Sequence, residues 1–261
     1  MYSESGLFDV RGKTALVTGG AQGMGRMIAN GLVRAGATVY ITSRKADICE
    51  RTALELGAFG QCYALPGELT TPEDVATLVK RLRERTPTLN ILINNAGRTW
   101  GAPLESFPDK AWAGVMAVNV QTPFTLVRDS LPLLKAAARE DDPARIINIG
   151  SLAGRAVEKL SAYSYAASKA AIHHLSRVLA ADLAQFNIAV NTIAPGYFPT
   201  QMTSHIQADE HSLETLRSRV PLRRLGSAND IAGTCLFLSS KAAAYITGAE
   251  IPVDGGMSGC R

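Results

Sequence analysis

The sequence has no long apolar run, no low-complexity tract and no strong excess of one charge. A membrane-spanning helix needs ~20 predominantly apolar residues, and no apolar run in this chain reaches that length. We also expect no cleavable signal at its start. Because linker-like and repetitive segments are missing as well, we predict a single domain over residues 1–261.

Cysteine is scarce, and its placement gives none of the spacings typical of metal or redox motifs. Cys49, Cys62, Cys235 and Cys260 are scattered along the chain, which favours reduced thiols in a cytoplasmic protein and predicts no metal site. The formal net charge of +4 is small and the basic residues are dispersed, so we expect no nucleic-acid partner. Hydrophobic residues make up 46% of the chain, which is enough for a large core.

Short apolar runs alternate with helical patterns along most of the chain. Such βα alternation is typical of a doubly wound α/β domain, in which crossover helices flank a parallel sheet. We expect helices over Pro72–Arg85 and Asn229–Leu238. We predict strands over Lys13–Thr18, Thr38–Thr42, Gln61–Leu65, Asn90–Asn94, Arg145–Ile149, Ile188–Ala194 and Glu250–Val253.

The first strand runs into a glycine-rich turn, TGGAQGMG, which precedes a helical pattern. Gly19, Gly23 and Gly25 permit a tight turn, and the start of the following helix favours negative charge. Glycine also serves turns that bind nothing, but a turn of this kind between a strand and a helix lets backbone approach a pyrophosphate. We therefore predict a nucleotide site at this turn.

Ser43 and Arg44 follow the second strand, where many NAD-binding folds carry an acidic residue. A carboxylate at that position holds the ribose 2′-hydroxyl, whereas an arginine accommodates a 2′-phosphate. Asp47, the only acid nearby, is better placed as a first-turn charge of the next helix. The pattern favours NADP(H) over NAD(H) as the cofactor.

Small polar residues follow two of the later strands. Asn94–Gly97 (NNAG) and Gly150-Ser151 are each delivered by a strand to the carboxyl edge of the sheet. Ligands of doubly wound folds bind at this edge. We expect both segments to line the nucleotide crevice.

A long helical region over Pro108–Arg139 contains Asn119 and two prolines, Pro123 and Pro132. Each proline removes a helix hydrogen bond, so we expect a bend or break near them. By itself, an asparagine inside a helix is an ordinary polar position.

The stretch Ser161–Ala184 has the pattern of a helix that is apolar on more than one face and therefore largely buried. Tyr165 and Lys169 lie four residues apart, so their side chains share a face and can touch one ligand. A phenol has a reference pKa of ~10, and a neighbouring ammonium group is expected to lower the pKa of Tyr165. Taken alone, the pair is more simply explained as two surface residues that share a face.

The βα alternation stops between Tyr197 and Leu225. This segment shows one or two helical turns around Leu213 and Leu216 and few other helix signals. We predict an irregular substrate lid around residues 197–225 that becomes ordered when substrate binds.

Taken in order, these motifs resemble those of the short-chain dehydrogenase/reductase family, and the resemblance covers Val10–Met257. The chain is most similar to 3-oxoacyl thioester reductases of the rhamnolipid type, on the stretches TWGAPLESFP, PARIINIGS, AYSYAASKAAIHHLSR and YITGAEIPVDGG. The signatures are TGGAQGMG at Thr18–Gly25, NNAG at Asn94–Gly97, Asn119, Ser151 in INIGS, YAASK at Tyr165–Lys169, and PG at Pro195–Gly196.

The resemblance implies a seven-stranded parallel sheet of order 3-2-1-4-5-6-7 and four catalytic residues. Tyr165 is the acid in reduction and the base in the reverse oxidation, and Lys169 lowers its pKa and binds the nicotinamide ribose. Ser151 hydrogen-bonds the substrate carbonyl. Asn119 lies on a distorted turn of its helix, where it holds a water of the proton relay.

The resemblance also assigns residues that contact cofactor and substrate. The expected cofactor contacts are Gly19, Gln22, Gly23, Met24, Gly25, Ser43, Arg44, Glu68, Leu69, Asn95, Ala96, Gly97, Tyr165, Lys169, Pro195, Gly196, Phe198 and Thr200. The expected substrate contacts are Thr99, Trp100, Leu152, Arg155, Leu160 and Met202, with Phe198 and Ile206 of the lid beside them.

The resemblance further implies a homotetramer, with dimer contacts through helices 112–139 and 165–186. Two departures from the family pattern matter. Glu68 stands where the family usually has an aspartate that holds the adenine. Thr125 and Phe186 stand where the carrier-protein reductases have docking arginines, which argues against an acyl-carrier protein as partner.

We therefore expect an NADPH-dependent reductase of a mainly apolar ketone, such as a 3-oxoacyl thioester or ester. The residues expected to contact substrate are mostly large and apolar, which suits such a substrate better than a sugar. Two alternatives stay open: a polyol, sugar or sterol dehydrogenase that works in the oxidative direction, and a non-catalytic NADP-binding regulator.

Overall fold

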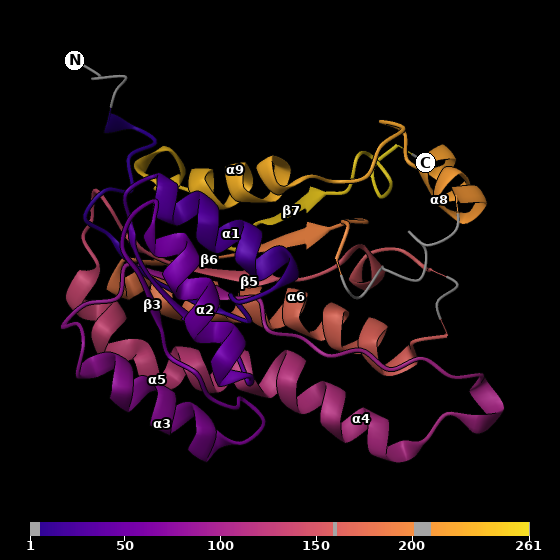
Figure 1. Cartoon of the computed structure of the whole chain (residues 1–261), viewed down its shortest axis with the longest axis horizontal. Coiled ribbons are helices and arrows are strands. Elements are labelled where there is room, and N and C mark those ends of the chain that lie inside the picture. The colour runs from indigo at the N-terminus through magenta and orange to yellow at the C-terminus, as the bar shows by residue number, and fades with distance from the viewer. Residues whose placement is uncertain (1–5, 159–160, 201–209, 261) are drawn as a thin grey trace.

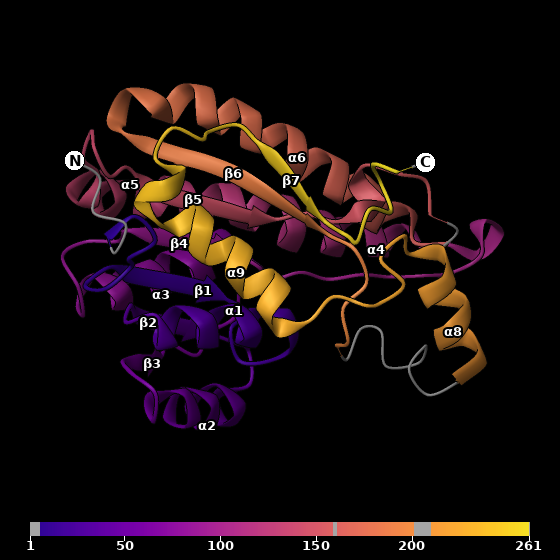
Figure 2. The ribbon, with the colours of Figure 1, turned by 90° about the horizontal axis from the view of Figure 1, so that it is seen from above.

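A computed structural model describes residues 6–158, 161–200 and 210–260. Seven parallel strands form one sheet in the order β3-β2-β1-β4-β5-β6-β7. Helices cover both faces of this sheet (Figures 1 and 2), which confirms the expected doubly wound fold and strand order. The strands are β1 (Thr14–Thr18), β2 (Thr38–Thr42), β3 (Cys62–Ala64), β4 (Ile91–Asn94), β5 (Ala144–Ile149), β6 (Ile188–Pro195) and β7 (Glu250–Val253).

β4, β5 and β6 are buried along their whole length because helices cover both faces of the sheet. One core layer lies between the sheet and α1, α2 and α9, and a second lies between the sheet and α3, α5 and α6. Figure 1 shows α1 and α9 on one side and α3 and α5 on the other. The helices are α1 (Gly23–Arg34), α2 (Ala46–Gly57), α3 (Pro72–Arg83), α4 (Asp109–Met116), α5 (Thr122–Ala137), α6 (Tyr163–Leu183), α8 (Glu210–Arg219) and α9 (Ala228–Ser239).

The helical region expected over residues 108–139 is interrupted at Ala117–Gln121, which form a π-helical turn between α4 and α5. Pro123 lies in the first turn of α5, where a residue without an N–H group is tolerated. The expected break is therefore found just before Pro123. The helix continues through Pro132 without ending there.

The second half of the expected lid is more regular than predicted. Residues 210–219 form α8, a ten-residue helix, where one or two turns were expected. Most residues of this helix are polar or charged, and only Leu216 is buried. The segment therefore lacks the apolar periodicity that would predict the length of a helix. Glu210 in its first turn and Arg217 and Arg219 in its last turn match the helix dipole.

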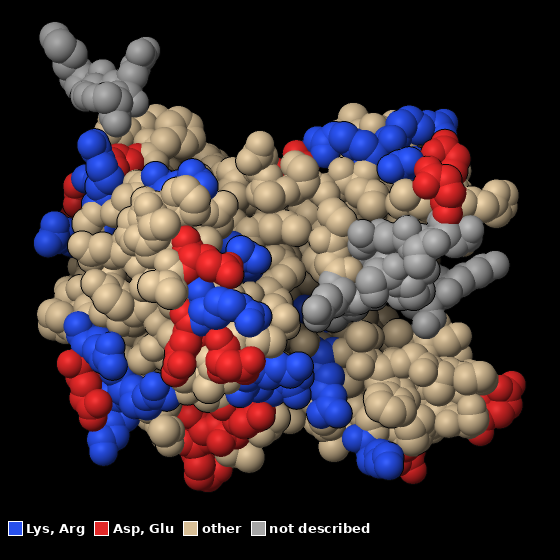
Figure 3. All heavy atoms as spheres, in the orientation of Figure 1, with Lys and Arg blue, Asp and Glu red and all other residues tan. Residues whose placement is uncertain are grey.

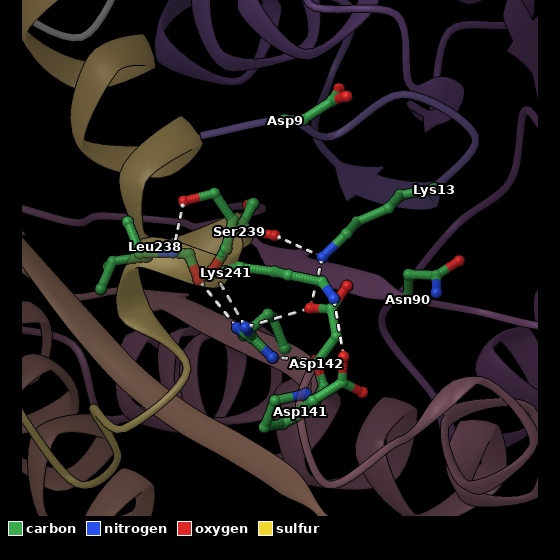
Figure 4. Close-up of polar contacts among 12 residues, drawn as sticks. Asp9, Lys13, Asn90, Asp141, Asp142, Leu238, Ser239 and Lys241 are labelled. Carbon is green, nitrogen blue, oxygen red and sulfur yellow. Dashed lines mark hydrogen bonds and ion pairs between the residues drawn. The ribbon is translucent and has the colours of Figure 1, made fainter. Parts of the chain in front are cut away.

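A buried ionic cluster lies at the amino-terminal edge of the sheet, opposite the edge expected to bind ligand (Figure 4). The Arg145 side chain is 1% exposed and donates to the backbone oxygens of Leu238 (3.1 Å) and Ser240 (2.9 Å) at the end of α9. Asp142 lies 3.3 Å from the Arg145 guanidinium and accepts a hydrogen bond from Lys13 Nζ at 2.7 Å. The cluster ties α9 to the starts of β1 and β5.

Replacing Arg145 with Met is expected to lower the free energy of unfolding by about 3–5 kcal/mol, because it removes the side-chain donor of two buried carbonyls and leaves Asp142 with one fewer cation. Lys241→Met is the matched control. Lys241 Nζ lies 2.7 Å from Asp141, but both side chains are exposed and solvent screens the pair, so the loss should be much smaller than that of the Arg145 variant. Urea unfolding of both variants measures the difference, and equal losses would contradict this role for Arg145.

Candidate active site

The carboxyl edge of the sheet brings the NNAG segment against the glycine-rich turn. Asn95 Nδ2 donates to Thr18 O at 2.9 Å. The Thr18 hydroxyl accepts hydrogen bonds from the backbone N–H groups of Asn95 (3.0 Å) and Ala96 (2.9 Å). These bonds join the segments that follow β1 and β4, which are neighbours in the sheet.

A chain of buried side-chain hydrogen bonds connects β4 and β5 to α6. Asn94 Nδ2 donates to Asn148 Oδ1 at 2.8 Å, and Asn148 Nδ2 donates to Ser176 Oγ at 2.8 Å. The Ser176 hydroxyl donates in turn to Ile172 O at 2.7 Å. Because buried amides are costly without partners, this chain fixes α6 against β4 and β5.

The glycine-rich turn has the geometry that a pyrophosphate site needs. Gly19 and Gly23 have φ values of +64° and +52°, in the left-handed region that favours glycine. A Cβ atom on Gly25 would lie 2.2 Å from Gly19 O and 2.4 Å from Asn95 Nδ2, so no larger residue fits there. α1 begins at Gly23 with no acidic side chain in its first turn, which leaves its positive end open to a phosphate. The residues present fit a dinucleotide.

The other residues expected around the turn are placed as follows. Met24 is half-buried in α1, and Gln22 is exposed at the N-cap of that helix. Thr200 lies 3.6 Å from the position of a Cβ on Gly23, so the segment after β6 reaches the turn. A cavity of about 760 Å³ opens on this side, between α1, α2 and residues 199–200.

The segments after β2 and β3 lie together beyond the glycine-rich turn. Ser43 O accepts a hydrogen bond from Gly67 N at 3.1 Å. Arg44 is exposed between β2 and α2, and Glu68 is exposed as well, whereas Leu69 is buried. The Arg44 side chain is thus free of the core and stands at the rim of the expected adenine side.

Asn119 lies inside the π-helical turn and is 2% exposed. Its side chain is anchored to the segment after NNAG, because Oδ1 accepts from Arg98 N (2.8 Å) and Nδ2 donates to Arg98 O (2.9 Å). Nδ2 also donates to Ser168 Oγ on α6 at 2.9 Å. A Cβ on Gly97 would lie 3.6 Å from Asn119 Oδ1 and 3.9 Å from Lys169 Nζ, so these three residues adjoin one another.

Tyr165, Lys169 and Ser151 come together at the first turn of α6. Lys169 is 5% exposed, and its Nζ donates to Ile149 O at 2.7 Å and lies 5.6 Å from the centre of the Tyr165 ring. The Ser151 side chain lies close enough to the Tyr165 hydroxyl to lower the pKa of Tyr165, and it accepts a hydrogen bond from Ala153 N at 3.1 Å. The structure thus assembles the expected pair with the expected serine.

The pKa of Tyr165 is raised above its ordinary value because burial disfavours the phenolate, although the neighbouring Ser151 side chain opposes this effect. This corrects the expectation that Lys169 lowers it. The Lys169 ammonium group is directed to a backbone carbonyl, and burial lowers its own pKa to about 8. Desolvation is the largest influence on the pKa of both groups.

One residue in contact with the site was not among the expected site residues. His173 is buried, and its Nε2 accepts a hydrogen bond from Ser151 N at 3.2 Å. Its four-residue spacing from Lys169 places it on the same helix face and was the only available sequence signal.

The residues expected to contact substrate differ in their availability. Thr99 and Trp100 are exposed after NNAG. Leu152 is buried in a small cluster with Val220 and Met257, and Arg155 pairs with Glu250 at 3.3 Å. Both side chains therefore make contacts within the protein itself. Leu160, Met202 and Ile206 lie outside the described residues.

The segment after β6 also corrects one expectation. Pro195 is buried, and a Cβ on Gly196 would lie 2.8 Å from Asp254 Cα, so the PG pair packs closely against the end of β7. Phe198 is 2% exposed and fills the space beside Gly226. Its ring is part of the core, and so it cannot line an open ligand site as expected.

Within the described ranges, no helix combines the length and the apolar character that a membrane crossing requires. The same residues contain no group of three His, Cys, Asp or Glu side chains placed to hold a metal ion. On the face seen in Figure 3, basic and acidic side chains are intermixed.

Comparison with known proteins matches residues 19–258 to the family described as enoyl-(acyl carrier protein) reductase. The chain is 46% identical to the rhamnolipids biosynthesis 3-oxoacyl-[acyl-carrier-protein] reductase of Pseudomonas aeruginosa, over 95% of this chain and 97% of that protein. It is 36% identical to 5-keto-D-gluconate 5-reductase of Escherichia coli, over 96% and 97% of the two chains.

Among solved structures, the Pseudomonas aeruginosa RhlG/NADP active-site complex superposes with a TM-score of 0.95 at 46% identity and covers 97% of this chain and 98% of that chain. The chain belongs to the short-chain dehydrogenase/reductase family and is an oxidoreductase of that family.

Replacing Lys169 with Met is expected to stabilise the ligand-free protein at pH 7 by roughly 1–3 kcal/mol, because a buried ammonium group is removed. Burial lowers the pKa of Lys169 from 10.5 to about 8. Below pH 8 both folded and unfolded chains are protonated there, and the penalty is fully present. From about pH 8 to 10.5 the unfolded chain binds the extra proton, so wild-type stability rises relative to the variant.

Thermal or urea unfolding without cofactor, repeated between pH 7 and 10.5, measures this gap. A variant that is less stable than wild type at pH 7, or a gap that does not narrow as the pH rises, would contradict the buried-charge account of Lys169.

Proposed function

We propose that this protein reduces the ketone of a mainly apolar substrate to a secondary alcohol, using NADPH. The observation that carries the proposal is the meeting of Tyr165, Ser151 and Lys169 at the carboxyl edge, beside a glycine-rich turn that fits a dinucleotide. An oxidoreductase family and an assembled proton donor argue against a non-catalytic regulator.

NADP(H) is the cofactor that the chain and its relatives favour. Arg44, exposed after β2, is placed to pair with a 2′-phosphate where NAD-binding folds carry an acid. Two solved relatives that cover 97% of this chain, at 46% and 33% identity, are NADP complexes. Gly19, Gly23 and Asn95 would hold the pyrophosphate turn, and Lys169 would meet the nicotinamide ribose.

Bound NADPH supplies the hydride, and the chain's own residues handle the charge and the proton. The Tyr165 hydroxyl donates its proton to the carbonyl oxygen as negative charge develops there, while the hydroxyl of the neighbouring Ser151 orients that oxygen. The raised pKa of Tyr165 keeps it protonated for reduction. Asn119 Oδ1 keeps one lone pair that is not used by the hydrogen bond from Arg98 N. This lone pair would accept a hydrogen bond from a water of the proton relay.

A 3-oxoacyl thioester or ester is the favoured substrate class, on the likeness to the 3-oxoacyl reductase. An acyl-carrier protein remains disfavoured as its carrier. Thr125, at one docking-arginine position, is buried, and Lys135 lies 3.3 Å above the Phe186 ring at the other. A sugar acid is the second candidate, because a 36% identical relative is a 5-keto-D-gluconate reductase.

A homotetramer through helices 112–139 and 165–186 is the proposed assembly. Trp112, Phe124 and Val178 are large apolar side chains exposed on these helices. The sequence of α6 is apolar on more than one side, although only one side is buried within the subunit. Burial of the outer side against a second subunit would account for this pattern.

Arg44→Ala is expected to raise the KM for NADPH at least tenfold and to change that for NADH little, because a charge-assisted bond to phosphate contributes about 1.5–3 kcal/mol. Arg51→Ala, an exposed arginine on neighbouring α2, is the matched control and should change neither value. Steady-state kinetics with both cofactors measures this. Equal use of NADH and NADPH by wild type would refute the assignment.

The substrate class is tested by comparing kcat/KM for an acetoacetyl thioester, a simple 3-oxoester and a keto-sugar acid at one NADPH concentration. We expect the thioester or ester to lead, and Tyr165→Phe to lose nearly all turnover while NADPH binding, followed by fluorescence, stays close to normal. A tenfold or greater preference for the sugar acid would reject the apolar substrate. A Tyr165→Phe variant with a tenth of wild-type activity would reject the proton donor.

A further inference from the structure

The short loop that carries Ser151 is flanked by two glycines, and the His173 imidazole occupies the space beside both. A Cβ on Gly150 would lie 2.1 Å from His173 Nε2, and a Cβ on Gly154 would lie 2.8 Å from His173 Cε1. No larger residue can therefore replace either glycine while the imidazole is in place. The ring packs against both ends of the loop and is 4% exposed.

The hydrogen-bond direction fixes the state of the ring. Ser151 N–H can only donate, so His173 Nε2 must accept with its lone pair, and the proton of a neutral imidazole then resides on Nδ1. Nδ1 lies 3.1 Å from Glu250 Oε1 on β7. No aligned hydrogen bond reaches Oε1 among the described residues, so the carboxylate acts on this proton mainly by electrostatic attraction.

We infer that His173, oriented by Glu250, is a positioning residue for Ser151: its neutral, Nδ1-protonated ring holds the Ser151 backbone in the orientation that directs the hydroxyl to Tyr165 and the substrate carbonyl. This inference rests on the proposed function of the site. It assigns to His173 no contact with substrate or cofactor.

Burial is the main influence that favours the neutral form of the ring, and it lowers the pKa of His173 from its ordinary 6.5. Glu250 favours protonation, whereas Lys169 and Arg177 on α6 and Arg155 after the Ser151 loop oppose it. The same Glu250 carboxylate lies 3.3 Å from Arg155 and 3.6 Å from Arg177, which divides its attraction among three partners.

Protonation would remove the acceptor that Ser151 N–H uses. The imidazolium presents two N–H groups, and the one on Nε2 would face another donor 3.2 Å away. The loop would have to shift, and misplacement of a catalytic group by about 1 Å can cost on the order of 10²-fold in rate. We therefore expect kcat to fall at acid pH, below the ordinary imidazole value of 6.5, as His173 becomes charged.

Three variants separate positioning from packing. His173→Leu removes the acceptor and should lower kcat by roughly 10- to 100-fold, with little change in the KM for NADPH. His173→Gln keeps a carbonyl oxygen where Nε2 lies, so it should recover most of kcat and lose the acid limb of the pH profile. His174→Leu is the control, since His174 is exposed and its one hydrogen bond among the described residues is with Arg177; it should behave as wild type.

The ring itself is tested in the protein without cofactor, by long-range ¹H–¹⁵N NMR of the imidazoles. We expect His173 to be the Nδ1-protonated tautomer and to titrate below pH 6.5. An Nε2-protonated ring, a His173→Leu variant with wild-type kcat, or a His173→Gln variant no better than His173→Leu would each overturn the inference. If wild type reduces no ketone, the proposed function fails, while the NMR result still decides the role of His173.

Discussion

The position of the whole site depends on the buried hydrogen bonds that run from Asn94 through Asn148 to Ser176. They cross two strands and end on the helix that carries Tyr165 and Lys169. A slip of that helix by one residue would break the chain and leave amides unpaired in a low-dielectric interior, where each costs ~1–3 kcal/mol. The proton donor is therefore placed by polar contacts in the core, several turns away from the chemistry.

The fold and most of the site framework follow from local patterns in the sequence. β1 and β2 are apolar runs of strand length that end in glycine or small polar residues, and each was expected to within one residue. The glycine-rich turn has the positive φ values that its composition requires. Tyr165 and Lys169 share a helix face because a four-residue spacing leaves no other arrangement.

What could not be predicted depends on contacts between distant segments. Nothing in the sequence near His173 points to Glu250, since the two meet only when β7 joins the sheet beside β6. The burial of Phe198 against Gly226 arises in the same way. The pKa of Tyr165 depends on how much water the fold excludes, which spacing along a helix does not report.

The π-helical turn at Ala117–Gln121 also ties the length of this region to its geometry. A π turn holds one more residue than an α turn, and each residue rotates an α-helix by ~100°. Deleting one residue there would restore a regular helix, but it would swing Trp112 and the rest of α4 to a different side relative to α5. In this region a substitution is therefore expected to disturb the fold less than the insertion or deletion of a single residue.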